Sequence, residues 1–219
     1  MDLSQKQILT PLQSKVLDYL FTENFPFFLT GGTALSAYYL FHRYSDDLDL
    51  FTLNDGLIGK ILPRMELMSR ELKLEMEVIQ TEPMFRRFIF RSGDEKVLVD
   101  LVRDIDNQIH NDKNMFGKIR VDTFDDIATN KICAILGRQE AKDFIDLFFI
   151  AKKGYDIDKY LVLAKNKDAG VNKATLAFLI KDFSVESLPA YMIESLNLDE
   201  MKEFYYNLSN KWAKESFPF

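Results

Sequence analysis

Two aspartates that alternate with leucines are the residues of this chain best suited to chemistry. Asp47 and Asp49 stand in the segment 47–51, where acidic and apolar residues alternate as they do in a half-buried strand. Side chains two residues apart on a strand point to one face, about 7 Å apart along the chain. The pattern therefore predicts two carboxylates side by side, and such a pair repels itself unless a cation lies between them.

A glycine turn precedes these aspartates. Gly31 and Gly32 follow a short apolar run at 27–29 and lead into 33–41, which lacks Gly and Pro, so strand, turn and helix are expected in that order. Backbone N–H groups at the start of a helix can bind phosphate oxygens, and Mg²⁺ often combines one or two carboxylates with substrate phosphates. Each feature alone is common, as a turn or as a solvated strand edge. Together they predict a site for a metal ion and a nucleotide.

The segment 27–51 resembles the signature of the AbiEii/AbiGii-type nucleotidyltransferases, which belong to the DNA polymerase β-like superfamily. The matching residues are Gly31, Gly32, Thr33, His42, Arg43, Ser45, Asp47, Leu48, Asp49, Leu50 and Phe51. The family includes toxins of toxin–antitoxin and phage-defence systems, among them the MenT group. The resemblance implies an α+β fold with a mixed β-sheet and flanking helices, two Mg²⁺ ions and a nucleoside triphosphate (NTP) donor.

The resemblance also implies roles for the matching residues. The triphosphate would be held by Gly31, Gly32 and Thr33. The loop or a phosphate would be positioned by Arg43 and Ser45. The two Mg²⁺ ions would be held by Asp47 and Asp49 together with a third carboxylate.

Asp100 is the candidate for that third carboxylate. Strands are expected at 74–79, 85–90 and 96–102, with a hairpin at 92–95. Asp100 interrupts the last of them, and because an unpaired buried carboxylate is costly, it is either a carboxylate exposed at a sheet edge or a third metal-site carboxylate on the strand beside Asp47 and Asp49. The superfamily places a metal ligand on such a strand, so the resemblance implies that Asp100 shares a metal with Asp47 and Asp49. It could also act as general base for the incoming hydroxyl.

Lys131 is the expected phosphate-binding residue of a helix at 125–138. It shares one strip of that helix with Ala134 and Arg138. In the family, a helix lysine contacts the nucleotide phosphates. We therefore expect Lys131→Ala to impair transfer with little loss of thermal stability.

Asp143 and Asp146 share one face of the next expected helix, 140–152. Asp143 could simply pair with Arg138 or Lys142. The pattern of these residues again resembles the family, in which an Arg/Lys-Asp-x-x-Asp segment supports the nucleotide site. Lys142 stands where arginine is commoner in the family. A lysine keeps the positive charge but lacks the planar guanidinium, which can donate two parallel hydrogen bonds.

The rest of the chain supplies the scaffold. A nucleotidyltransferase core is expected at 1–124, followed by an α-helical C-terminal domain at 125–219 that contributes to the active site. In the core we expect an amphipathic helix at 4–25, in which Thr10-Pro11 is either a cap or a break, a helix at 57–72, a surface loop at 105–118 and a short strand at 119–124. In the second domain we expect further helices at 157–164, 173–183 and 198–212.

The composition is that of an ordinary globular protein. Of its 219 residues, 47% are hydrophobic and 28% are charged. The single cysteine, Cys133, excludes an internal disulfide, and no apolar run reaches the length of a membrane span, so we expect a cytoplasmic protein without a membrane partner. The net charge of −6 gives no general attraction to nucleic acid.

The expected reaction is Mg²⁺-dependent transfer of a nucleoside monophosphate from an NTP to a hydroxyl group. Within the resemblance, the acceptor is an RNA such as tRNA, and the protein is a toxin with a cognate antitoxin. A small molecule or a protein remains an alternative acceptor. A catalytically idle relative that binds a nucleotide as a regulator is a further alternative, against which the presence of all three carboxylates argues.

Overall fold

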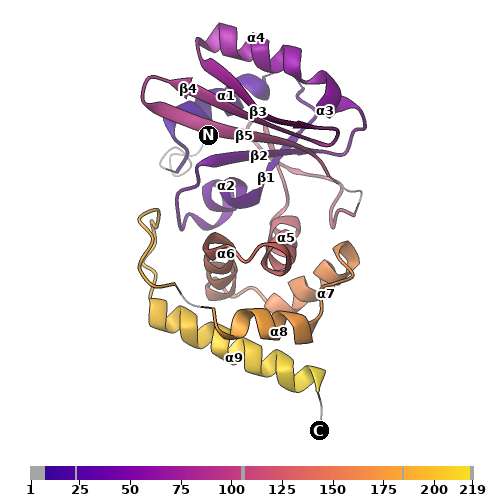
Figure 1. Ribbon diagram of the computed structural model, residues 1–219, viewed down its shortest axis with the longest axis vertical. Helices are drawn as coiled ribbons and strands as arrows, with labels where there is room; N and C mark the ends of the chain where they lie inside the picture. Colours follow the sequence, from indigo (N-terminus) through magenta and orange to yellow (C-terminus); the bar gives the residue numbers. More distant parts are fainter. Residues whose placement is uncertain (1–7, 23, 105–106, 184, 218–219) are drawn as a thin grey trace. The chain divides into compact units, whose positions relative to one another are not determined.

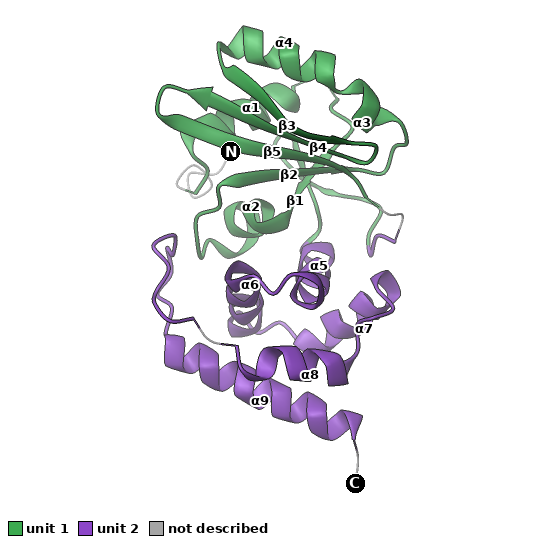
Figure 2. Ribbon diagram, in the orientation of Figure 1, with its two compact units in different colours: residues 1–106, 110–123 green, residues 107–109, 124–219 purple. Residues whose placement is uncertain are grey.

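The computed structural model describes residues 8–22, 24–104, 107–183 and 185–217. The chain divides into two compact units (Figure 2). The sheet unit comprises residues 1–106 and 110–123, and the helical unit comprises residues 107–109 and 124–219.

The described part of the sheet unit forms one seven-stranded mixed sheet in the order β3-β4-β5-β2-β1-β7-β6 (Figure 1). The strands are β1 (Phe28–Thr30), β2 (Asp47–Thr52), β3 (Glu75–Glu82), β4 (Phe85–Ser92), β5 (Glu95–Arg103), β6 (Asn114–Phe116) and β7 (Ile119–Val121). The pairs β2–β5 and β1–β7 are parallel, and the other pairs are antiparallel. This is the expected α+β class with a mixed sheet.

Alternation along the strands divides the sheet into a core face and a half-exposed face. In β2, Leu48 and Leu50 are fully buried, whereas Asp47 and Asp49 are partly exposed. The expected hairpin is confirmed, because Ser92 pairs with Glu95 and leaves a two-residue turn between β4 and β5. The leucines therefore anchor β2 in the core while its aspartates face outward.

The helices of the sheet unit are α1 (Pro11–Leu20), α2 (Gly31–Leu35), the π-helix η2 (Ser36–Leu40), α3 (Leu57–Lys60) and α4 (Leu62–Leu72). Thr10 caps α1 through a capping box, in which its hydroxyl accepts from the Gln13 backbone N–H and the Gln13 side chain accepts from the Thr10 backbone N–H. The cap, rather than the break, is therefore the correct interpretation of Thr10-Pro11. The helix α1 is shorter than the one expected at 4–25, since it begins at Pro11 and ends at Leu20, and residues 4–7 and 23 of that expectation lie outside the described residues.

Two expectations about this unit are wrong in detail. The helix expected at 57–72 is divided at Ile61 into α3 and α4, because Pro63 in the first turn of α4 has no N–H to continue the preceding helix. The loop expected at 105–118 contains β6, which exists through its antiparallel pairing with β7. Positions 105 and 106 of that loop lie outside the described residues.

The helical unit contains α5 (Phe124–Gly137), α6 (Ala141–Lys152), α7 (Ile157–Lys167), α8 (Lys173–Lys181) and α9 (Leu198–Ser216). Its core is aromatic: the ring of Phe144 stacks on that of Phe183 with centroids 3.6 Å apart, and Tyr205 donates a hydrogen bond to the Phe144 carbonyl. Trp212 on α9 is buried, and its indole N–H donates to Asp158 at 2.7 Å. Across the described ranges of both units, no helix is long and apolar enough to cross a membrane.

Candidate active site

Three carboxylates gather on the half-exposed face of the sheet. Asp49 on β2 is the register partner of Asp100 on the adjacent parallel strand β5, so the two side chains lie on one face. Asp47 lies two residues before Asp49 on β2 and therefore shares that face. We refer to Asp47, Asp49 and Asp100 as the carboxylate row, since alternation along β2 and the pairing of β2 with β5 place them on one face.

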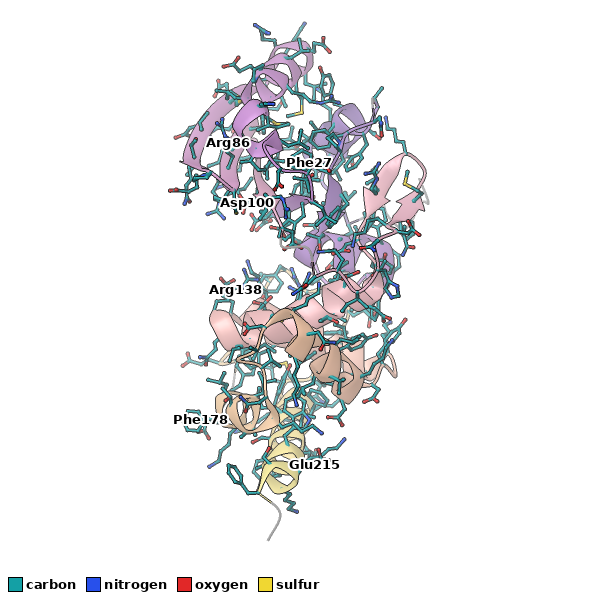
Figure 3. The ribbon with its side chains drawn as sticks, turned by 90° about the vertical axis from the view of Figure 1, so that its right-hand side faces the viewer. Phe27, Arg86, Asp100, Arg138, Phe178 and Glu215 are labelled. Carbon is teal, nitrogen blue, oxygen red and sulfur yellow. The ribbon has the colours of Figure 1, made fainter. Side chains whose placement is uncertain are left out.

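Asp100 does not lie at a sheet edge. Its strand, β5, is flanked by β2 and β4, and the Asp100 side chain is only 9% exposed (Figure 3). The first alternative from the sequence, an exposed edge carboxylate, is therefore wrong. A carboxylate buried to this extent needs a partner, and β4 supplies it.

Arg87 on β4 is that partner, and the sequence did not indicate it. It is in register with Asp100, and its guanidinium donates from Nε to Oδ1 at 2.8 Å and from Nη2 to Oδ2 at 2.7 Å. The hydrogen bonds with Asp100 raise the pKa of Arg87, and the charges of Asp47 and Asp49 raise it further. Arg87 therefore experiences the field of the whole carboxylate row.

Gly31 and Gly32, which were expected to form a turn before a helix, are the first two residues of α2 and lie against side chains of the candidate site. Gly31 has a φ of +69°, and a Cβ there would overlap the Asp49 carboxylate, whose Cγ lies 2.8 Å from the ideal Cβ position. A Cβ on Gly32 would lie 2.5 Å from Arg43 Nη2 and 3.3 Å from Ser45 Oγ. Gly31 needs glycine because of its positive φ and the packing of Asp49 against its bare backbone, whereas a side chain at Gly32 would require the end of the Arg43 side chain to move.

Arg43 and Ser45 belong to the loop between η2 and β2. The Arg43 guanidinium is buried against Gly32, and its Nη1 donates to the Tyr44 carbonyl at 2.9 Å. The Ser45 carbonyl accepts a hydrogen bond of 2.7 Å from Gln13 on α1. Of the two roles expected for Arg43 and Ser45, these contacts favour positioning of the loop.

Thr33 is buried, and its hydroxyl donates to the backbone carbonyl of Asp47. The side chain thus holds the start of β2 against α2. The Thr33 hydroxyl is therefore engaged within the protein, and the contact of Gly31, Gly32 and Thr33 with a triphosphate stays a prediction.

Lys131 lies in a buried ion cluster of the helical unit. Its ammonium lies 2.8 Å from Asp143 Oδ1 and 2.6 Å from Asp146 Oδ2, and the Lys131 side chain is 6% exposed. Arg138, which is labelled in Figure 3, follows α5. It donates from Nε to Asp143 Oδ2 at 2.7 Å and from Nη2 to Oδ1 at 3.0 Å. Asp143 pairs with Arg138, as one sequence alternative expected, whereas Lys142 pairs with Glu140.

This cluster changes the expected cost of losing Lys131. The side chains of Asp143 and Asp146 are both fully buried. Burial alone would raise the pKa of Asp143, but the hydrogen bond from Arg138 and the charge of Lys131 outweigh it and hold the pKa below its usual value. Because the substitution Lys131→Ala would remove a partner from two buried charges, these contacts argue against the expectation of little stability loss, and we now expect a substantial loss. The contact of Lys131 with nucleotide phosphates stays a prediction.

The donor set of the carboxylate row fits Mg²⁺, which takes oxygen ligands and commonly binds through one or two carboxylates. The Asp49 carboxylate fills the space that is open because Gly31 has no side chain. In the described ranges, no three His, Cys, Asp or Glu residues are already drawn together around one metal position. Instead, the guanidinium of Arg87 binds both oxygens of Asp100.

The mixed sheet, the Gly-Gly turn and the carboxylates on β2 and β5 define a nucleotidyltransferase core. The sequence model of the family "Nucleotidyl transferase AbiEii toxin, Type IV TA system" matches residues 18–215, and the chain belongs to this family. It is therefore a nucleotidyltransferase of the AbiEii type.

Relatives and solved structures agree with this assignment. An uncharacterized protein of Aquifex aeolicus (strain VF5), aq_aa25, is 28% identical over 191 residues, which cover 82% of this chain and 84% of the relative. The structure of JHP933 from Helicobacter pylori aligns with a TM-score of 0.61 and 21% identity, covering 98% of this chain and 94% of that one. A candidate nucleotidyltransferase of H. pylori aligns with a TM-score of 0.58 and 19% identity, covering 93% and 92%. The two structures share the fold.

Proposed function

We propose that this nucleotidyltransferase depends on Mg²⁺ and transfers a nucleoside monophosphate from an NTP to a hydroxyl group of an RNA such as tRNA. The observation that carries the proposal is the register of Asp49 with Asp100, with Asp47 on the same face. The acceptor hydroxyl gives its proton to Asp100, the candidate general base, its oxygen bonds to the α-phosphorus of the NTP, the bond from that phosphorus to the bridging oxygen breaks, and pyrophosphate leaves.

The candidate site residues of the sheet unit would each have a separate role in this reaction. Asp47, Asp49 and Asp100 would hold two Mg²⁺ ions, which when bound stabilise charge on the attacking and leaving oxygens. The backbone N–H groups of the Gly31-Gly32 turn would bind the triphosphate. Arg43 and Thr33 hold the loop and the start of β2, so that Asp47 and Asp49 keep their positions.

We further propose that the protein acts as the toxin of a type IV toxin–antitoxin pair and has a cognate antitoxin. The description of its family supports this role. An RNA acceptor would need local contacts, because the net charge of −6 repels nucleic acid on average.

Transfer of label from NTPs tests the reaction. The purified protein is incubated with Mg²⁺ and each of the four α-³²P-labelled NTPs, together with total RNA, small hydroxylated compounds or proteins. We expect label in RNA that ribonuclease releases, and none with Asp49→Asn. Label only in a small molecule or a protein would overturn the RNA proposal, and no label in any fraction would overturn the transfer itself.

Growth of a host cell tests the toxin role. Induced expression of the wild-type chain should arrest growth, whereas Asp49→Asn at the same protein level should not. Equal growth with both chains, at confirmed expression, would contradict the toxin role while leaving the transferase activity untouched.

A further inference from the structure

Arg87 and Asp100 form a bidentate ion pair inside the proposed metal site. Both oxygens of Asp100 accept hydrogen bonds from one guanidinium, at 2.8 and 2.7 Å. Such fork-to-fork pairs are among the stronger ion pairs of proteins, and they fix the orientation of the carboxylate plane. Arg87 therefore binds both oxygens of Asp100, the carboxylate that lies beside Asp49.

The placement of Arg87 differs from that of another arginine on the same strand. Arg91 lies four residues farther along β4 on the same face and pairs with Glu77 of β3 rather than with a carboxylate of the row, although its side chain is exposed to nearly the same extent as that of Arg87, 38% against 37%. Arg87 instead faces the carboxylate row, and the ring of Phe85 lies 5.5 Å from its guanidinium carbon. The two arginines therefore differ in the carboxylate that each one binds and not in their exposure.

We propose that the positive charge of the Arg87 guanidinium competes with divalent cations for the Asp100 carboxylate. This inference rests on the proposed function, in which the row holds the metal. A positive charge in hydrogen-bond contact with Asp100 offsets one of three negative charges and repels an incoming cation. An NTP adds negative charge and shifts that balance, so Arg87 makes uptake of the metal depend on the nucleotide.

Binding of Mn²⁺ tests this inference without measuring activity. Free Mn²⁺ is followed by electron paramagnetic resonance as it is titrated into the full-length protein at constant ionic strength, without nucleotide. Arg87→Gln removes the charge but keeps a hydrogen-bond donor for Asp100, and it should bind Mn²⁺ roughly tenfold more tightly. Arg87→Met, which removes the charge and the donor, is measured in parallel and should also bind more tightly.

Two control variants separate local competition from other effects. Arg91→Gln removes the same charge from the same face of β4, about 13 Å farther along the strand, and screening should hold its effect below about twofold. Arg87→Lys keeps the charge and should stay near the wild-type affinity. In the wild type, a non-hydrolysable ATP analogue should tighten Mn²⁺ binding more than it does in Arg87→Gln.

The outcomes distinguish this inference from the proposed function. If Asp47→Asn leaves Mn²⁺ binding unchanged, the row is not the metal site and the proposed function fails. If Asp47→Asn abolishes binding but Arg87→Gln and Arg87→Met bind Mn²⁺ no more tightly than the wild type, the row holds the metal and the role of Arg87 is overturned. An equal gain in Arg91→Gln would also overturn it.

Discussion

Asp49 and Asp100 are register partners on two adjacent parallel strands, β2 and β5. They lie 51 positions apart in the sequence, and only the crossover through β3 and β4 brings them together. Parallel pairing then places the two carboxylates side by side on one face, and Arg87 of β4 is in register with Asp100 on that face. The sheet, rather than a loop, therefore sets the spacing of the proposed metal ligands.

The first prediction concerns Asp49. Asp49→Asn should lower the transfer rate at least about a hundredfold, because it removes a charged oxygen ligand from the site where charge develops. Its unfolding free energy should stay within about 1 kcal/mol of the wild type, since the substitution relieves repulsion within the row. Asp94→Asn in the exposed β4–β5 turn is the control and should change neither quantity. Wild-type activity in Asp49→Asn would exclude the carboxylate row as the catalytic site.

The second prediction concerns the glycine beneath Asp49. Gly31→Ala should destabilise the protein by roughly 1–3 kcal/mol and abolish transfer, because the new Cβ would overlap the Asp49 carboxylate in a backbone with φ of +69°. Gly93→Ala is the matched control: its φ is +58°, but nothing lies within 4 Å of its ideal Cβ. It should carry a similar backbone cost and keep full activity. Similar activity in the two variants would show that the Gly31–Asp49 contact does not matter for catalysis.

Local patterns were enough to predict every strand of the described sheet except β6, together with the two aspartates of β2. Alternation of Asp47, Leu48, Asp49 and Leu50 is a property of a few neighbouring residues, and burial of the leucines follows from it. The strand β6 could not be predicted, because its three residues are extended through pairing with β7 rather than through any pattern of their own.

The sequence also did not show which charged residues form ion pairs with one another. Arg86 and Arg87 are adjacent and alike, and only the register of β4 against β5 selects Arg87 as the partner of Asp100. Lys131 and Asp146 are joined by the packing of α5 on α6, which helical periodicity alone does not specify. Such pairings depend on how elements meet, so a single sequence shows the candidates without the pairs.

The third prediction concerns acid stability. The pKa of Asp143 lies below its ordinary value of 3.8, so the folded state binds fewer protons than the unfolded state at low pH. The stability that Asp143 contributes is complete above pH 3.8 and is lost as the pH falls below that value. Urea unfolding between pH 6 and pH 3 should therefore show a smaller acid-induced loss in Asp143→Asn than in the wild type, although the variant is less stable at pH 6. An equal loss in both proteins would show that Asp143 is not held ionised.

The last prediction concerns the buried cluster around Lys131. Lys131→Ala leaves Asp146 without this partner and removes one of the two cations that contact Asp143, so the unfolding free energy should fall by about 3–5 kcal/mol. Lys142→Ala removes the partner of Glu140 at the surface and should cost less than about 1 kcal/mol. Urea denaturation at pH 7 measures both losses.

A double-mutant cycle then identifies the charge responsible for that loss. Lys131→Met with Asp146→Asn removes both members of one buried pair and leaves Asp143 with Arg138, so it should be more stable than Lys131→Met alone. Additive losses would show that Lys131 and Asp146 do not interact.

Transfer by folded Lys131→Arg, measured below its unfolding temperature, separates a role at the nucleotide from this role in stability. Arginine keeps the charge, so a fold that survives with transfer strongly reduced would support contact of Lys131 with the phosphates, whereas full activity would leave it a structural residue.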